Sequence, residues 1–199
     1  QDYCEGRLTL TSGTPVTTAD VTAATTIYFA PYKGNRIALY DAASTLKWYQ
    51  FPFTQRSIAV PATTNTNYDV FIYITGGVVT LELVAWTNAT TRATALTTQD
   101  GILVKSGDAS RRYLGSFRTT GVSGQTEDSR VKRFIWNYYN RVKRPLHYTI
   151  ATSTWTYATA TWRQANADAG AQVALICGWL EDEVSLKLAC AETSQYIPM

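Results

Sequence analysis

Short stretches with a strand-like hydrophobic pattern recur along this chain, and residues that favour turns separate them. In each stretch, apolar and polar residues alternate or β-branched and aromatic residues run together, which is typical of strands buried on one or both faces. The segments between them supply the Gly, Pro and Asn that turns require. We therefore predict strands at 7–11, 25–30, 35–40, 45–51, 56–60, 68–74, 78–86 and 111–117.

The same pattern continues in the second half of the chain, and no helix-length periodic segment lies between the early strands. Because βαβ units need such helices, the pattern predicts an all-β fold, an antiparallel β-sandwich that is jelly-roll-like. We expect residues 1–199 to form a single β-rich domain, with 121–129 as the best candidate for an internal boundary and 87–101 as a long exposed loop. Later strands are predicted at 146–151, 153–162, 171–180 and 184–191.

One stretch, RVKRFIWNYYNRVKRP at 130–145, is ambiguous between strand and helix. Its apolar residues also fall at helical spacing, but Val, Ile, Phe, Trp and Tyr crowd it, which favours a strand buried on both faces. The stretch holds six of the 18 Lys and Arg residues and no acid, so the remaining 12 cations and 15 acids sum to −3.

The cations and aromatics of 130–145 raise the question of nucleic-acid binding. Bases could stack on the aromatic rings while the cations hold phosphates. However, the basic charge is local, and the stretch lacks the Gly of the RNA-recognition signature. We therefore predict no nucleic-acid partner, with the cations solvated or paired with carboxylates of a neighbouring subunit, and we place four aromatics in the core or a subunit interface: Phe134, Trp136, Tyr138 and Tyr139.

Candidate catalytic and metal chemistry is sparse, and we predict that the chain is not an enzyme. His147 is the only histidine, and no Ser or Cys lies in a nucleophile motif. Glu127, Asp128 and the acids at 181–183 are interpreted as turn or cap residues. No phosphate-cradling loop and no zinc or calcium signature is present, so no cofactor or metal is expected. No apolar run reaches the ~20 residues that span a bilayer, so no membrane insertion is expected.

A second aromatic group lies in STWTYATATWRQ, which holds Trp155, Tyr157 and Trp162 followed by Arg163. Aromatic faces can stack on the C–H face of a sugar, and Arg163 could bond its hydroxyls. These four residues are therefore the glycan-contact candidates, although a buried core or a subunit interface is the favoured interpretation. They leave a carbohydrate-binding module as the alternative function.

Several segments together resemble virion proteins of tailed bacteriophages and prophages, of the tail-fibre or head-fibre type. The segments are GRLTLTSGTPVTTADV, YKGNRIALYD, RYLGSFRTTGVSGQTEDS, KRFIWNYYNRVKRP and WRQANAD, and the resemblance runs over most of the chain. It implies a structural or host-attachment component of the virion, assembled in the host cytoplasm beside other virion proteins. It carries over no catalytic residues.

The expected partners follow from the aromatic content and the resemblance together. Trp and Tyr exceed what a small core needs, and aromatics are favoured at protein interfaces. Fibres usually have threefold symmetry, so we expect a homotrimer, with a host surface glycan as a further candidate partner.

Overall fold

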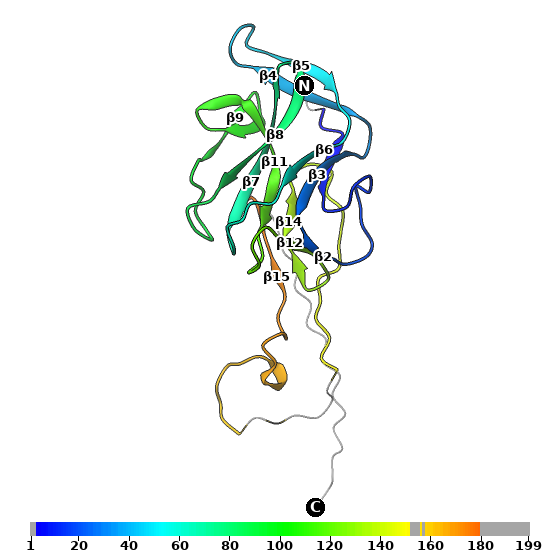
Figure 1. The fold of residues 1–199 in the computed structure, drawn as a ribbon. Helices are drawn as coiled ribbons and strands as arrows, with labels where there is room; N and C mark the ends of the chain where they lie inside the picture. The colour runs from blue at the N-terminus through cyan, green and yellow to red at the C-terminus, as the bar shows by residue number, and fades with distance from the viewer. Residues whose placement is uncertain (1–2, 152–155, 157, 180–199) are drawn as a thin grey trace, which may run out of the picture.

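The structure is a computed structural model that describes residues 3–151, 156 and 158–179. Within these residues it contains β-strands and one 3-10 turn at Ala165–Ala167, and no α-helix (Figure 1). Among the residues described there is accordingly no helix long and apolar enough to cross a membrane. The all-β, sandwich-like prediction is confirmed.

The strands form four sheets. One sheet has the order β1 (Gly6–Thr9), β3 (Thr26–Pro31), β6 (Arg56–Ala59). The largest has the order β8 (Val78–Ala85), β7 (Asn67–Thr75), β11 (Asp108–Arg118), β10 (Ile102–Lys105), β9 (Leu96–Gln99), and β14 (Ile135–Asn137) also pairs with β11. A hairpin joins β4 (Arg36–Asp41) to β5 (Lys47–Pro52). The fourth sheet has the order β15 (Ala174–Leu175), β13 (Lys132–Arg133), β12 (Thr126–Asp128), β2 (Val21–Ala24).

The strand pairings are antiparallel except for one. β13 and β15 run parallel, with Lys132 opposite Ala174 and Arg133 opposite Leu175. The early strand predictions each overlap a strand of the structure. Several neighbouring strands are joined by hairpins, and the strand order is not specific to a jelly roll.

The predicted loop at 87–101 is wrong in its second half, because β9 lies within it and pairs with β10. Asp100 and Gly101 form the connection, and both have positive φ, 52° and 81°. An Asp-Gly pair in this conformation is the usual two-residue turn of a β-hairpin. That dipeptide was the signal in the sequence for this hairpin.

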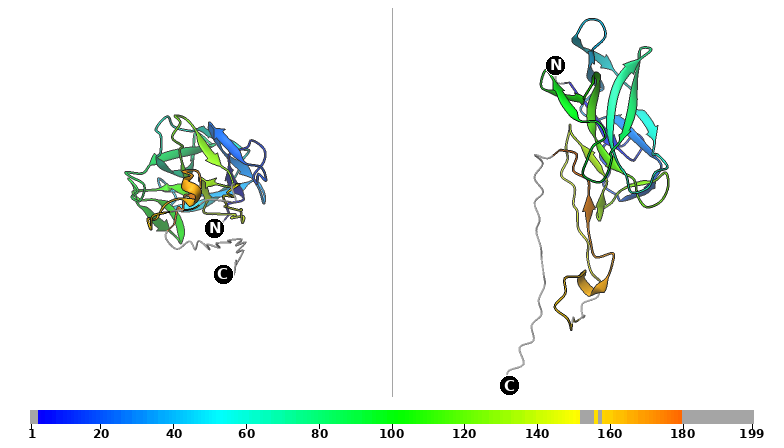
Figure 2. Two further views of the ribbon diagram at one scale, coloured as in Figure 1. Left: turned by 90° about the horizontal axis from the view of Figure 1, so that it is seen from below. Right: turned by 90° about the vertical axis from the view of Figure 1, so that its left-hand side faces the viewer.

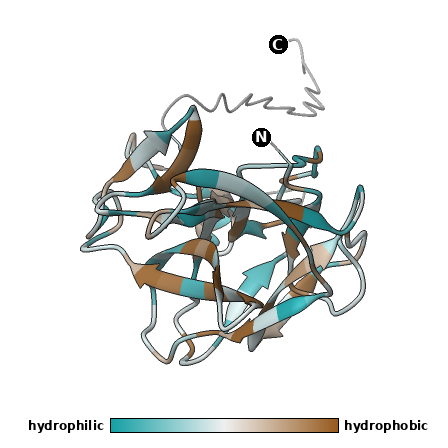
Figure 3. Cartoon of the chain, turned by 90° about the horizontal axis from the view of Figure 1, so that it is seen from above, coloured by the Kyte–Doolittle hydropathy of each residue, from teal (hydrophilic) through white to brown (hydrophobic). Residues whose placement is uncertain are grey.

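Two layers enclose the main core. One layer contributes Leu8, Ile27 and Phe29 from the β1-β3-β6 sheet, and β4 adds Ile37 and Leu39 beside it. The facing layer contributes side chains of β7, β8 and β11, among them Val70, Ile72, Leu81, Leu114 and Phe117. Hydrophobic and hydrophilic residues alternate along many of these strands (Figure 3), as sandwich strands require.

A second, smaller cluster lies on the opposite face of the large sheet. Phe71, Leu103 and Tyr113 are buried there. Consecutive residues of a strand point to opposite faces. Ile72 of β7 therefore joins the main core, while its neighbour Phe71 joins the second cluster.

The 130–145 stretch forms neither a helix nor one long strand. It contains the short strands β13 and β14 and then continues without regular structure from Tyr138 to Pro145. β14 lies along β11 at residues 115–117, beyond the part of β11 that pairs with β10. β14 therefore occupies the short part of β11 between the residues that pair with β10 and the end of β11 at Arg118, and it has three residues.

Residues 146–151, 156 and 158–173, here called the excursion, lie outside the sheets (Figures 1 and 2). The described residues of the excursion form no β-strand, so the strands predicted at 146–151 and in the described part of 153–162 are wrong. Of the prediction at 171–180, only Ala174–Leu175 is a strand. The prediction at 184–191 lies outside the described residues.

Arg112 on β11 is fully buried between the two layers. Its Nη1 donates to the carbonyls of Tyr3, at 3.0 Å, and Ala38, at 2.9 Å, and its Nε donates to the Tyr139 hydroxyl at 3.3 Å. The guanidinium carbon also lies 4.6 Å from the centre of the Tyr139 ring. One side chain therefore joins β11 to β4, to the N-terminal segment and to the 130–145 stretch.

We expect Arg112→Ala to lower the free energy of unfolding by about 3 kcal/mol, because it leaves a cavity and buried carbonyls without their donor. Urea denaturation measures this change. The matched control is Arg36→Ala, since Arg36 is exposed, and it should change the same quantity by less than about 0.5 kcal/mol. Equal effects of the two substitutions would contradict the role given to Arg112.

Candidate functional site

Four aromatics were predicted for the core or an interface. They lie where the large sheet meets residues 174–179, here called the returning chain. Phe134 is buried, and the other three are half-buried. Trp136 and Tyr138 pack against the second cluster, whereas Tyr139 packs against the main core. The stretch thus lies over both hydrophobic clusters.

Two asparagines fasten this stretch to β1. The Asn137 side chain accepts from the Leu8 backbone N–H at 2.7 Å and donates to the Leu8 carbonyl at 3.1 Å. The Asn140 amide donates to the carbonyls of Cys4 and Gly6 at 2.7 and 2.9 Å. A side-chain amide can copy the donor and acceptor pattern of a strand. The aromatic stretch is therefore held in one position relative to β1.

Gly178 marks the point where the returning chain meets the aromatic rings. A Cβ atom at this position would lie 2.4 Å from Cε3 of Trp136 and 2.5 Å from the hydroxyl oxygen of Tyr113. Real Cβ atoms do not approach other atoms this closely, so only Gly fits here. The backbone of the returning chain therefore packs directly on the second cluster.

A buried polar network fixes the same point. Arg92 donates to the Gly178 carbonyl, and its Nε is 2.7 Å from Oδ2 of Asp69. Ser116 donates to the other carboxylate oxygen of Asp69 at 2.7 Å, and the hydroxyls of Ser116 and Tyr113 are hydrogen-bonded at 2.6 Å. The network joins β7, β11 and the loop after β8 to the returning chain.

Burial raises the pKa of Asp69, although the Arg92 guanidinium and the Ser116 hydroxyl act in the opposite direction. Burial also raises the pKa of Tyr113, and the nearby carboxylate of Asp69 adds to this shift. Tyr113 is therefore protonated at neutral pH and can serve as a hydrogen-bond donor. Asp69, Arg92, Ser116 and Tyr113 are bound to one another inside the fold, which suits a structural role.

Most cations of the 130–145 stretch bind carboxylates of the same chain. Arg130 pairs with Asp20, Lys132 with Glu127, and both Arg133 and Arg144 with Asp128, at 2.9 to 3.2 Å. We expected these cations to be solvated or paired with carboxylates of a neighbouring subunit, and these four pair with carboxylates of the same chain instead. Glu127 and Asp128, interpreted from the sequence as turn or cap residues, are buried in β12. Arg141 lies over the Trp136 ring, 4.8 Å from its centre.

Of the four glycan-contact candidates, the structure describes Trp162 and Arg163. Trp155 and Tyr157 lie outside the described residues. Trp162 is fully exposed in the excursion, and Arg163 donates to the carbonyl and the hydroxyl of Thr159.

His147, the only histidine, is exposed, and its backbone N–H donates to the Arg130 carbonyl. Cys4 is buried and Cys177 half-buried. Within the described ranges, no three His, Cys, Asp or Glu side chains are grouped as metal ligands.

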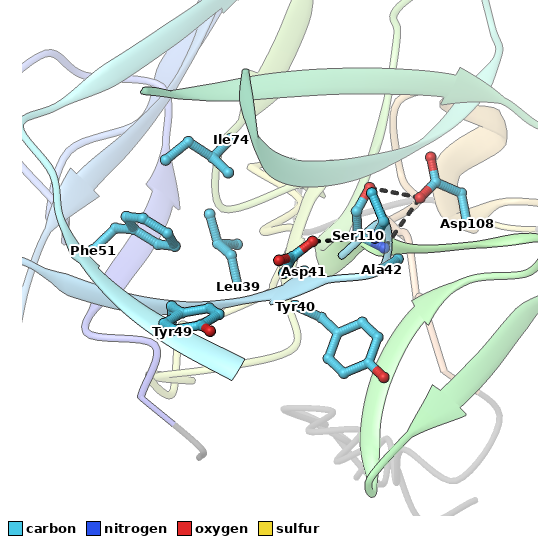
Figure 4. A pocket seen from close by; sticks show the side chains of 10 residues that line it. Leu39, Tyr40, Asp41, Ala42, Tyr49, Phe51, Ile74, Asp108 and Ser110 are labelled. Carbon is cyan, nitrogen blue, oxygen red and sulfur yellow. Dashed lines mark hydrogen bonds between the residues drawn. The ribbon is translucent and has the colours of Figure 1, made fainter. Parts of the chain in front are cut away.

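A groove of about 490 Å³ lies between the β4–β5 hairpin and the ends of β7 and β11 (Figure 4). Leu39, Tyr49 and Phe51 line it from the hairpin, and Ile74 lines it from β7. Register explains this set, because Leu39 is opposite Tyr49 and Ile37 is opposite Phe51, so alternate residues share one face of the hairpin. This groove was not predicted from the sequence, because its walls come from segments that are distant along the chain.

The other end of the groove is polar and comes from Asp41, Asp108 and Ser110. Asp41 accepts from the backbone N–H groups of residues 43–45 and from the Thr45 hydroxyl. The hydrogen bonds from Thr45 are the largest of the effects that lower the pKa of Asp41, and those from Ser44 and Ala43 add to them. Asp108 accepts from the backbone and the hydroxyl of Ser110. These bonds fix both carboxylates in place.

Comparison with models of protein families, with curated protein sequences and with solved structures finds no match for this chain.

We expect Gly178→Ala to loosen the returning chain. The backbone N–H groups of Ala174 and Ile176 donate to the carbonyls of Val131 and Arg133, at 2.9 and 3.0 Å, and hydrogen exchange reports on these bonds. Their exchange should accelerate at least tenfold in the variant, while exchange in β7 stays unchanged.

The matched control for this experiment is Gly121→Ala, because a Cβ there would lie 3.8 Å from its nearest neighbour, an ordinary contact. Unchanged exchange at Ala174 and Ile176 in Gly178→Ala would show that the returning chain does not depend on this close approach.

Asp69 gives a prediction about pH. Its raised pKa means that, above the ordinary Asp value of about 4, the folded state binds more protons than the unfolded chain. The stability that Asp69 contributes is thus present below that value and falls as pH rises through the folded pKa. The loss of unfolding free energy in Asp69→Asn should be larger at pH 4 than at pH 7, as measured by urea denaturation.

Asp41→Asn is the control of opposite sign. The pKa of Asp41 is lowered by its hydrogen bonds from Thr45, so its contribution is present above the ordinary Asp value and falls as pH drops through the folded pKa. Its substitution should therefore cost more at pH 7 than at a pH well below the ordinary Asp value, where the folded state is also protonated. The same trend with pH in both variants would contradict the assignment of burial as the dominant effect on Asp69.

Proposed function

We propose that this chain is a structural or host-attachment component of a bacteriophage particle, such as a fibre, spike or surface decoration protein, and that it forms a homotrimer. The resemblance of five sequence segments to tail-fibre and head-fibre proteins supports the first part. The proposal gives the chain no catalytic role. Its partners are other copies of itself and other virion proteins, in a particle assembled in the host cytoplasm, with a host surface glycan as a further candidate.

The observation that carries the proposal is the excursion. Its described residues form no β-strand, and several apolar side chains there are exposed, among them Tyr148, Trp162 and Val173. Ordering the backbone costs about 1–2 kcal/mol per residue, and burial of apolar surface or strand pairing normally offsets that cost. Contacts with neighbouring copies would supply both, and a particle subunit has such neighbours.

The anchoring of the excursion also suits an assembled subunit. Arg133 donates to the Pro145 carbonyl through Nε at 3.0 Å and Nη2 at 2.7 Å, and the strand that contains Arg133 pairs with β15. Arg133 is bound to Asp128 in turn, at 2.9 Å. The two ends of the excursion are therefore held at one place on the sandwich, which fixes where its exposed side chains can meet another copy.

Purified particles test the assignment to the virion. Mass spectrometry of particles from a phage that carries this gene should detect the chain at a fixed ratio to the major capsid protein. Particles grown from a nonsense mutant of the gene should lack the chain and should show either reduced adsorption to the host or a visible structural defect. Absence of the chain from purified wild-type particles would show that the proposal is wrong.

Light scattering tests the trimer. The full chain should have about three times the mass of one chain, 22.1 kDa, at micromolar concentration. Trp162→Ser should lower the trimer fraction, since a large aromatic at an interface commonly contributes about 2 kcal/mol or more. Val122→Ser is the matched control, because Val122 is also exposed but lies outside the excursion. A mass of 22.1 kDa for the wild-type chain would contradict the trimer.

A further inference from the structure

The groove between the β4–β5 hairpin and the ends of β7 and β11 has two chemically different ends (Figure 4). Phe51, Leu39 and Ile74 gather at one end, with the Tyr49 ring beside them. Asp41, Ser110 and Asp108 lie at the other end. A ligand that fills the groove must therefore be apolar on one side and hydrogen-bonding on the other.

Tyr49 is the aromatic side chain at the mouth of the groove. It is 42% exposed, so a large part of its surface is open to a ligand. Tyr40, the neighbouring aromatic, turns away and packs on Trp48, with 5.3 Å between the ring centres. Tyr49 is thus available for stacking, whereas Tyr40 already has an aromatic neighbour.

The polar end offers hydrogen-bond acceptors of fixed position. Asp108 uses Oδ1 for Ser110, and its Oδ2 lies 3.6 Å from Nη1 of Arg111, beyond hydrogen-bond distance. Oδ2 of Asp108 can therefore accept from a ligand. The carboxylates of Asp41 and Asp108 repel phosphates and acidic sugars, so an anionic ligand does not suit this groove.

The negative charge of these two carboxylates is already partly balanced, which also disfavours the binding of a simple cation. Four donors of its own turn surround Asp41, and the Arg111 guanidinium lies beside Asp108. A ligand cation would thus meet carboxylates whose charge is already partly balanced. Neutral hydroxyl donors can share a carboxylate oxygen without that competition.

We propose that this groove binds a neutral saccharide of one or two sugar units. The C–H face of the sugar packs on Tyr49, Phe51 and Ile74, and its hydroxyls donate to Asp108 and to the remaining lone pair of the Ser110 hydroxyl, whose proton is already donated to Asp108. Small-ligand pockets run from about 300 to 1,000 Å³, and the groove, at about 490 Å³, falls within this range. The inference does not depend on the virion assignment, since binding is measured on the purified chain.

Saturation-transfer NMR on the full chain tests the inference, because it detects weak binding. The probes are methyl glycosides of glucose, galactose, mannose and N-acetylglucosamine, together with lactose and maltose. Glucuronic acid and butylamine serve as the anionic and cationic comparison ligands. We expect a saturable signal from at least one neutral saccharide and a weaker signal, or none, from both comparison ligands.

Variants locate the binding. Tyr49→Ala should weaken the dissociation constant of the bound saccharide about tenfold, because it removes the stacking face, and Asp108→Asn should weaken it because it removes a charged acceptor. Tyr32→Ala is the matched control for an exposed tyrosine outside the groove, and it should leave binding within about twofold. Circular dichroism checks that the three variants remain folded.

Three outcomes would overturn the inference. The first is the absence of a saturable signal from every neutral saccharide. The second is stronger binding of butylamine than of any saccharide, which would assign the groove to cations. The third is binding that Tyr49→Ala leaves intact, since this would place the sugar outside the groove.

Discussion

The fold depends on the burial of two consecutive polar side chains on opposite faces of β11, Arg112 and Tyr113. A buried guanidinium or hydroxyl is costly unless it is hydrogen-bonded, so each face of the strand must supply partners. On one face the partners of Arg112 are carbonyls of β4 and of the N-terminal segment. On the other face Tyr113 binds Ser116 and the Gly178 carbonyl.

These two requirements organise the rest of the chain around one strand. Arg112 brings residues more than seventy positions away in the sequence to β11, and Tyr113 brings Gly178 from the other direction. The ion pair between Arg92 and Asp69 strengthens the second contact from a third segment. The returning chain is consequently part of the sandwich, even though the excursion before it lies outside the sheets.

The strands that the sequence predicts best are those whose neighbours in the chain are also their neighbours in a sheet, such as β4 with β5 and β7 with β8. In such strands, apolar residues alternate with polar ones because one face is buried, and this alternation can be read from the local sequence. The parallel pairing of β13 with β15, the partner of Arg92 and the groove beside Tyr49 were not predictable in this way. Each depends on contact between segments that are distant in the sequence, and such contacts leave no periodic pattern in either segment.

The aromatic stretch shows the same limit within one segment. Its composition indicates burial, and Phe134 is buried. The composition does not show that Asp20, Glu127 and Asp128 balance its cations, because ion pairing depends on which strands lie side by side. Asn137 and Asn140 set the position of the stretch, yet nothing in their spacing indicates that they form hydrogen bonds with the N-terminal strand region.

The closure of the excursion at Arg133 has an evolutionary consequence. The chain is fastened at Arg133 both before and after the excursion, so the stability of the sandwich depends little on the number of residues between these two points. Doubling the length of a flexible loop costs only about 0.6 kcal/mol of folding free energy. Insertions and deletions can therefore accumulate in that segment while the sandwich stays constant. A change in the length of the excursion should therefore alter the contacts that this protein makes more than it alters the stability of its fold.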